Sequence, residues 1–141
     1  MIITVKVELI FGGFSSEEDE ECVKVVEIDS SSNLDDLHIA IQEAVGFDND
    51  HLYEFFIANT FRSMERRQFN DENNGLYEHT LEDLFPLPKG KSLFYLFDYG
   101  DNWNFRVSKT RHKAKLPLKG AIYPRVIEEF GVNPVQYPEY E

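Results

Sequence analysis

Residues 31–46 read SSNLDDLHIAIQEAVG, and this stretch decides the fold that the sequence predicts. Its ends carry helix signals: Ser32 followed three residues later by Asp35 resembles a capping box, and Gly46 suits the left-handed position that closes a helix. Between them, apolar side chains recur at spacings of three and four residues, as on one face of an amphipathic helix. This stripe is Leu34, Leu37, Ile41 and Val45. The pattern predicts one main helix with an apolar face to bury.

Segments on both sides of this helix have the composition and alternation of β-strands. They are residues 1–11 (MIITVKVELIF), 22–28 (CVKVVEI), 51–57 (HLYEFFI), 92–99 (SLFYLFDY) and 103–108 (WNFRVS). The first two are expected to form a hairpin, and so are the last two. This order predicts an α+β fold, with a mixed or antiparallel sheet of about five strands and one main helix packed on one face, in the manner of a β-grasp.

The segments between and after these strands are expected to be loops and short helices. The periodicity lapses from residue 58 to 78, which predicts a loop rich in turn-forming residues. Residues 80–85 (TLEDLF) predict a single helical turn that Thr80 and Asp83 cap and that stops at Pro86. Pro124 precedes RVIEEFG, and a proline at the start with Gly131 at the end favours a short helix.

One domain is expected to span residues 1–141, because a single core typically serves ~100 to 200 residues. A run of five consecutive carboxylates predicts an exposed acidic loop at residues 14–21. The tail at residues 132–141 has prolines and no periodicity, so we expect it to lie along the surface or to be loose.

The charge balance limits the classes of partner. The chain has 26 acidic and 14 basic residues, a net charge of -12, which repels phosphate backbones and anionic membranes. We therefore expect neither nucleic acid nor a membrane as a partner, while a protein partner is possible. One stretch is basic instead, and it could neutralise the chain's own acidic loop, an acidic partner or, less in keeping with the total charge, a phosphate backbone. Its bases are Arg106, Lys109, Arg111, Lys113, Lys115, Lys119 and Arg125.

Cysteine usage and hydropathy favour a soluble cytoplasmic protein. Cys22 is the only cysteine, so an intrachain disulfide and a cysteine metal cage are excluded. The N-terminal run reads as a strand rather than as a signal peptide. No apolar run approaches the ~20 residues that span a bilayer.

The hairpin sequence FDYGDNWNF at residues 97–105 is the most suggestive local motif. In a structural interpretation Gly100 takes a positive-φ turn position, Asp98 and Asp101 accept backbone N–H bonds, and Trp103 packs on the sheet. In a functional interpretation the two aspartates bind a ligand. The structural interpretation is favoured, because aspartate in a glycine-containing turn needs no further cause.

Other polar side chains could join these aspartates if the fold brings them together. His38, His51 and Glu54 suit a divalent ion in their residue types, but their spacing matches neither an HExxH nor an EF-hand pattern. His38 lies beside the helix stripe and is more simply a partly buried histidine bonded to backbone. We assign no catalytic residue, metal or cofactor, and the sequence leaves open whether the protein is an enzyme. The candidate binding surface is His38, His51, Tyr53, Glu54, Asp98, Asp101 and Trp103.

Three ordered motifs resemble the Ri-plasmid ORF-three-like family, whose members often carry the label TnpR-like insertion-element passenger protein. They are a helix L-x-x-L-H-x-x-I-Q at residues 34–42, a strand H-L-Y-x-F at 51–55, and D-x-G-D-x-W at 98–103. The chain departs from the family in two places: an acidic segment replaces a Pro-Ile-Trp-Arg sequence between the first two strands, and Phe97 replaces a tyrosine. The resemblance implies a fold and a shared surface, without an activity.

Three functions remain open on these observations. The first is a small non-catalytic binding or adaptor module, because no complete catalytic constellation is present. The second is a metal-dependent hydrolase or nuclease that uses Asp98, Asp101, His51 and Glu54. The third, suggested by the family label, is an accessory protein in DNA transactions of mobile elements.

Overall fold

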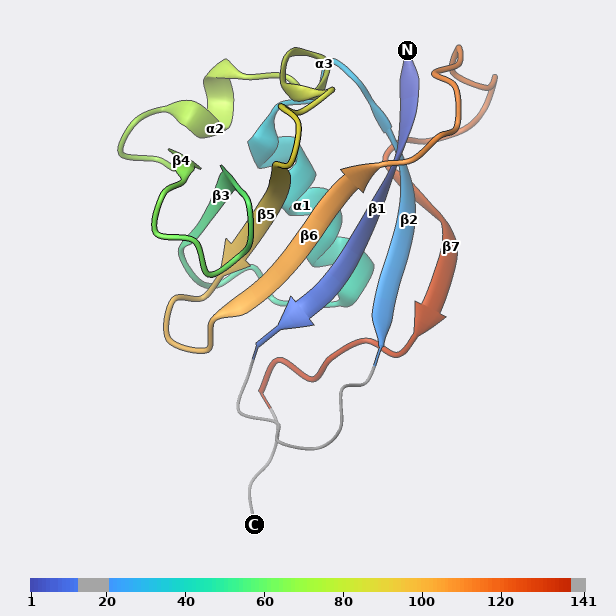
Figure 1. Ribbon diagram of the computed structural model, residues 1–141. Helices are drawn as coiled ribbons and strands as arrows, with labels where there is room; N and C mark the ends of the chain where they lie inside the picture. The colour runs from blue at the N-terminus through green and yellow to red at the C-terminus, as the bar shows by residue number, and fades with distance from the viewer. Residues whose placement is uncertain (13–20, 138–141) are drawn as a thin grey trace.

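The computed structural model describes residues 1–12 and 21–137, which form one twisted sheet with helix α1 behind it (Figure 1). Seven strands are hydrogen-bonded in the order β4-β3-β5-β6-β1-β2-β7. Every neighbouring pair is antiparallel. In chain order the elements are β1 (Ile2–Phe11), β2 (Cys22–Asp29), α1 (Leu34–Val45), β3 (Tyr53–Ala58), β4 (Arg67–Phe69), α2 (Gly75–Glu78), α3 (Leu81–Leu84), β5 (Ser92–Phe97), β6 (Trp103–Lys109) and β7 (Arg125–Gly131).

The expected α+β, β-grasp-like fold with about five strands and one main helix is wrong. The protein is mostly a seven-stranded antiparallel sheet with three short helices. The five predicted strands exist, and the two predicted hairpins pair as expected. The error lies at the two edges of the sheet, where β4 and β7 add a strand each.

The edge strands were missed for different physical reasons. β4 has only three residues in a polar segment, too short for an alternating pattern. The prediction of a helix at β7 was wrong because a leading proline and a closing glycine suit a helix, but they also suit an edge strand that opens after a turn. β7 is exposed along nearly its whole length, so no alternation of buried and exposed positions marked it as a strand.

Helix α1 is confirmed and packs its apolar stripe on one face of the sheet, here called the inner face. Leu34, Leu37, Ile41 and Val45 are at most 1% exposed, and they share one core cluster with Val5, Val26 and Phe105 on the strands. The capping box is one residue later than predicted, because the Asn33 side chain accepts from the Asp36 N–H and Asp36 from the Asn33 N–H. Gly46 closes the helix at φ 76°, as expected.

The opposite, outer face of the sheet has a smaller apolar cluster of Phe56, Ala58 and Phe94. The loop between β3 and β4 crosses this face, and its Arg66 guanidinium lies 3.9 Å from the centre of the Phe56 ring. The two faces of the sheet therefore carry separate sets of side chains.

The described part of the C-terminal segment runs back along the surface to the loop after α1. Gln136 accepts a 2.7 Å hydrogen bond from the Asp48 N–H, and the Tyr137 hydroxyl donates to Asp50 at 2.5 Å. Residues 14–20 of the predicted acidic loop and residues 138–141 of the tail lie outside the described residues. No helix in the described ranges is long and apolar enough to cross a membrane.

Candidate functional site

His38 belongs to a closed ring of side-chain hydrogen bonds under helix α1. Its Nδ1 lies 2.5 Å from the Tyr95 hydroxyl and its Nε2 lies 2.6 Å from Asn49 Oδ1. Gln42 Nε2 donates to the same hydroxyl at 2.9 Å, and Gln42 Oε1 accepts from the Asn49 N–H at 2.9 Å. One arrangement satisfies all four residues: the neutral imidazole donates from Nε2 to Asn49 and accepts at Nδ1 from Tyr95. His38 is therefore bonded to side chains, and the expected backbone bond is not the one that forms.

Tyr53 adds a second layer to this ring. Its aromatic ring stacks on the His38 imidazole, with 3.5 Å between centroids and an angle of 1° between planes. The Tyr53 hydroxyl donates to the Asp35 carboxylate. Burial, followed by that hydrogen bond, raises the pKa of Tyr53 above its ordinary value. Both His38 and Tyr53 thus use their polar atoms within the fold, which makes them supports of α1 rather than open ligands.

We expect the stability to depend on pH through His38. Burial lowers the pKa of His38 below its ordinary value of about 6.5, so near that pH the unfolded chain binds more protons than the folded chain. The stability that the neutral ring contributes is full above about pH 6.5 and is lost as the pH falls toward the lowered pKa, by at most ~1.4 kcal/mol per pH unit. Urea unfolding at several pH values measures it.

His38→Gln provides the reference for this dependence, since it removes the titrating imidazole, and the contacts that it also changes contribute equally at every pH. The difference in free energy of unfolding between wild type and His38→Gln should shrink as the pH falls from about 7 to about 5.5. The buried Glu54, whose pKa is raised by burial, gives an opposite slope but is present in both proteins and cancels. A difference that stays constant with pH would contradict the neutral, buried ring.

His51 and Asp98 come together just before β3 begins, beside the β5–β6 hairpin. His51 Nε2 lies 3.3 Å from Asp98 Oδ2 and 2.7 Å from the Tyr137 hydroxyl. Asp50 is the other partner of that hydroxyl, and the bond lowers the pKa of Asp50 and raises the pKa of Tyr137 to about 12. This junction attaches the C-terminal segment to the sheet, and Tyr137 in it was not a predicted site residue.

In the hairpin at residues 97–105 Asp98 accepts backbone N–H bonds as predicted, whereas Asp101 takes part through its backbone N–H, and its carboxylate accepts no hydrogen bond within residues 1–12 and 21–137. Asp98 Oδ1 accepts from the N–H groups of Gly100 at 3.1 Å and Asp101 at 3.3 Å. The positive φ expected at Gly100 occurs instead at Asp98 (61°) and Asn102 (58°). Asp98 is 7% exposed. Its Oδ1 holds the turn, and its Oδ2 faces His51.

Trp103 packs inside the hairpin end of the inner face and is 3% exposed. Its ring centroid lies 5.1 Å from that of Phe47, and its backbone comes so close to Gly12 that a Cβ there would stand 2.6 Å from Trp103 Cα. Its indole N–H has no hydrogen-bond partner within residues 1–12 and 21–137. Trp103 is a core residue and does not belong to an open binding surface.

Glu54 lies apart from the other predicted site residues. Neighbouring strand positions point to opposite faces, so Glu54 lies on the outer face while Tyr53 lies on the inner one. There it accepts a 3.1 Å hydrogen bond from Gln68. No group of three or more His, Cys, Asp or Glu side chains in the described chain has a geometry that could hold a metal ion. The side chains that the metal-dependent hydrolase would need therefore do not lie together, because Glu54 is on the face opposite to His51 and Asp98.

Several bases of the stretch 106–125 pair with carboxylates of the chain itself. Arg106 Nε lies 3.0 Å from Glu8 Oε1, and Glu27 receives both Lys115 at 2.5 Å and Arg125 at 2.6 Å. Glu27 is 3% exposed, and the hydrogen bond from Lys115 leads the effects that lower its pKa. These pairs join β6, Lys115 and β7 to carboxylates of β1 and β2, which leaves fewer cations for a phosphate backbone.

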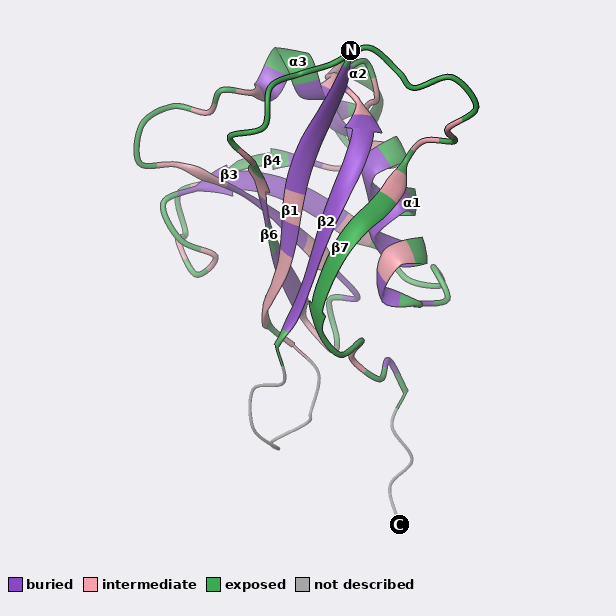
Figure 2. Ribbon diagram, turned by 90° about the vertical axis from the view of Figure 1, so that its right-hand side faces the viewer, coloured by how far each residue is buried: buried purple, intermediate pink, exposed green. Residues whose placement is uncertain are grey.

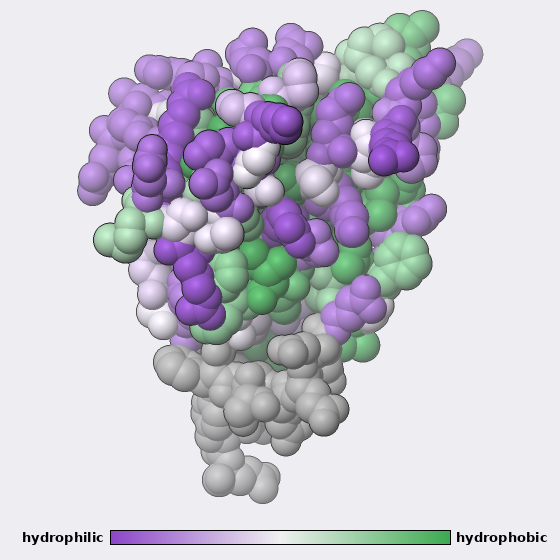
Figure 3. Space-filling view, viewed as in Figure 1, coloured by the Kyte–Doolittle hydropathy of each residue, from purple (hydrophilic) through white to green (hydrophobic). Residues whose placement is uncertain are grey.

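An exposed apolar surface lies on β7 and on the segment at residues 110–124, here called the strap. Figure 2 shows β7 exposed along the edge of the sheet, and Figure 3 shows apolar side chains over the strap at the upper right. The large apolar side chains there are 39–83% exposed. They are Leu116, Leu118, Ile122, Val126, Ile127 and Phe130. In the part of the chain that the structure describes, no strand pairs with the second edge of β7.

This surface was missed in the sequence, although a signal was present. The residues RVIEEFG were assigned to a helix from their ends, while Val126, Ile127 and Phe130 are types enriched in strands. Giving more weight to those side chains than to Pro124 and Gly131 would have predicted an edge strand. The predicted site residues, in contrast, lie mainly inside the fold.

Comparisons with known proteins support the fold and name no activity. The family model described as plasmid pRiA4b ORF-3-like protein matches residues 2–135. The uncharacterized protein y4hQ of Sinorhizobium fredii is 29% identical over 101 residues, which are 72% of this chain and 50% of that protein. The chain thus spans about half the length of this curated relative.

A solved structure has the same fold. The crystal structure of MM3350, a protein of unknown function from Methanosarcina mazei Go1, matches with a TM-score of 0.72 over 94% of this chain and 71% of that chain. The two sequences are 22% identical, so the likeness concerns the fold alone. None of these descriptions confirms the TnpR-like label.

Proposed function

Because this chain belongs to the plasmid pRiA4b ORF-3-like protein family, whose relatives described above have no stated activity, we propose its function from its surface. We propose that it is a small non-catalytic binding module of the cytoplasm that pairs an extended segment of a partner protein with the open edge of β7. The observation that carries this proposal is a seven-residue edge strand with exposed apolar side chains.

An open strand edge offers backbone donors and acceptors to another strand. Exposed edges of this kind are usually shortened, charged or covered, because they otherwise join foreign strands. β4, at the other edge of the sheet, follows that rule with three residues. β7 is longer and carries exposed apolar side chains on both faces, Val126 beside Val26 on the inner face and Phe130 beside Val23 on the outer one, so an added strand finds apolar contacts on either side.

The negative charge of the chain favours an added segment that carries basic side chains. Glu128 is exposed and has no ion pair among the described residues, and the whole chain has a net charge of -12. Basic side chains alternating with apolar ones would meet Glu128 and be drawn by the overall field. The occupant we propose is therefore an extended, basic and apolar segment of another protein.

A second copy of this chain fits the edge less well. The register between β2 and β7 shifts so that Ile127 is an extra residue, and such bulges hinder flat pairing of two rigid edges. Two copies would also bring two chains of net charge -12 together. A flexible segment can follow the bulge, whereas a second folded sheet cannot.

Two synthetic peptides test this proposal. One alternates valine with lysine over ten residues and the other alternates valine with glutamate. We expect the lysine peptide to bind in titration calorimetry, to shift β7 and β2 amide resonances, and to slow hydrogen exchange in β7. The glutamate peptide should bind at least about tenfold more weakly, because the field repels it.

Variants locate the binding. Ile127→Ser with Phe130→Ser should weaken the lysine peptide at least about tenfold, while Ile39→Ser, an equally exposed isoleucine on α1, should leave it unchanged. Circular dichroism verifies that each variant is folded. Equal binding of both peptides, binding unaffected by the β7 variants, or sedimentation showing a dimer that excludes the peptide would each overturn the proposal.

A further inference from the structure

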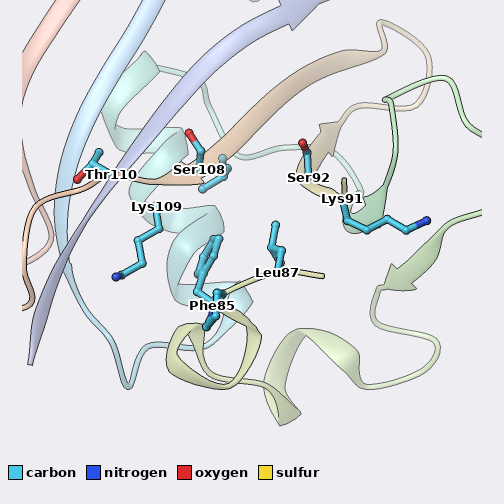
Figure 4. A pocket seen from close by; sticks show the side chains of 9 residues that line it. Phe85, Leu87, Lys91, Ser92, Ser108, Lys109 and Thr110 are labelled. Atoms are coloured by element: carbon cyan, nitrogen blue, oxygen red, sulfur yellow. The ribbon is translucent and has the colours of Figure 1, made fainter. Parts of the chain in front are cut away.

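A cavity of about 340 Å³ lies at one end of β5 and β6, two central strands of the sheet. It is bounded by the segment after α3 and by the adjoining ends of β5 and β6 (Figure 4). Its apolar wall comes from Phe85, Leu87 and Val107, of which Val107 is 1% exposed. The volume is at the lower end of the range of ~300–1,000 Å³ that is usual for small-molecule sites.

Positively charged side chains flank this wall. Lys91 and Lys109 line the cavity, whereas the hydroxyls of Ser92 and Ser108 point away from Phe85 and Leu87 in Figure 4. In Figure 4 the two lysine side chains extend in opposite directions, with Phe85 and Leu87 between them. An apolar wall with a cation on either side suits a ligand that is apolar in part and carries negative charge.

The two lysines differ from the bases that the chain pairs with its own carboxylates. Lys24, Arg106, Lys115 and Arg125 each pair with a carboxylate of the chain. Lys91 and Lys109 form no ion pair within residues 1–12 and 21–137, and no carboxylate lines this cavity. Their charge is therefore available to a ligand.

The cavity continues toward the other cationic part of this region. A second cavity of about 520 Å³ shares Pro86 and Lys91 with the first and is lined in addition by Arg66 and Arg67. Glu65 and Asp83 line the second cavity as well, so its charge is mixed and the first cavity is the more selective for an anion. Lys91 stands where the two cavities meet.

We propose that the cavity lined by Phe85, Leu87 and Val107 binds a small amphipathic carboxylate, with its apolar part on these side chains and its carboxylate on Lys91 or Lys109. This site shares no residue with the β7 edge, so it is independent of the function proposed above. Each of the two can fail without affecting the other.

Three eight-carbon probes of similar size test the site. Octanoate carries the carboxylate, octanamide is its neutral analogue, and octylamine has the opposite charge. In titrations followed by amide resonances, octanoate should shift Val107, Ser108 and Leu87, with octanamide and octylamine at least about tenfold weaker. Raising the salt concentration should weaken octanoate, since both lysines contact solvent.

The combined variant Lys91→Gln and Lys109→Gln should weaken octanoate at least about tenfold and leave the weak binding of octanamide unchanged. Lys119→Gln, a lysine on the strap outside the cavity, removes one positive charge and should have no effect. Leu87→Gln should weaken octanoate and octanamide alike, because it removes apolar contact. Equal affinity for the acid and the amide, or octanoate binding that survives the double lysine variant, would overturn the proposal.

Discussion

Leu37→Ala should lower the free energy of unfolding by about 2–5 kcal/mol. Leu37 is fully buried where α1 meets the sheet, and its truncation removes apolar contacts and leaves a cavity that the antiparallel strands cannot close. Domains of this size are stable by ~5–15 kcal/mol, so the loss would be a large part of the total. Urea unfolding followed by circular dichroism measures it, with the slope against denaturant reporting whether the exposed surface has changed.

Ile39→Ala is the matched control, because it truncates an aliphatic side chain on the same helix. Ile39 points away from the sheet and is 42% exposed. Its replacement should change the stability by no more than ~0.5 kcal/mol, as for an ordinary surface change. A cost below that value for Leu37→Ala would refute the packing of α1 on the inner face.

The centre of the fold could be predicted from the sequence, and the edges could not. Side chains in β1 and α1 repeat with the period of the element because one face of each meets the core, and β5 is a continuous apolar run that is buried on both faces. β7 has solvent on both sides and β4 is too short, so neither position has a periodic pattern to read. The predicted number of strands is therefore too small by two, the edge strands β4 and β7, which widen the sheet and add little to its core.

The candidate site shows the same limit in chemical terms. His38, His51 and Asp98 were selected for their residue types, and the structure places His51 next to Asp98. The types do not tell whether a polar atom is already used, since the partners of His38 come from positions 11 and 57 residues away. Only the assembled fold shows that the His38 ring is saturated and that Glu54 lies on the other face.

The family motifs acquire a physical meaning from this arrangement. The helix motif supplies His38 and Gln42, the strand motif supplies Tyr53, and all three meet around Tyr95 at the inner face. Buried polar groups must be paired, so a change at one of them penalises the others. These motif residues set how α1 sits on β3 and β5, and they leave the choice of ligand to other surfaces.

Tyr95→Phe should lower the free energy of unfolding by about 1–3 kcal/mol, although it removes a single oxygen. Tyr95 is fully buried, and its hydroxyl is the partner of both His38 Nδ1 and Gln42 Nε2. Without it these two atoms stay buried with no partner, and the penalty is their desolvation rather than lost apolar contact. Urea unfolding of the variant at about pH 7.5, where His38 is neutral in both states, measures this cost.

Two further variants separate the hydrogen-bond ring from the loss of a hydroxyl as such. Tyr77→Phe makes the same change at a tyrosine that is 57% exposed, and should cost less than ~0.5 kcal/mol. Gln42→Leu removes a donor to Tyr95, so combining it with Tyr95→Phe should cost less than the sum of the two single changes. Strictly additive costs, or a Tyr95→Phe protein as stable as wild type, would show that the ring does not hold α1 on the sheet.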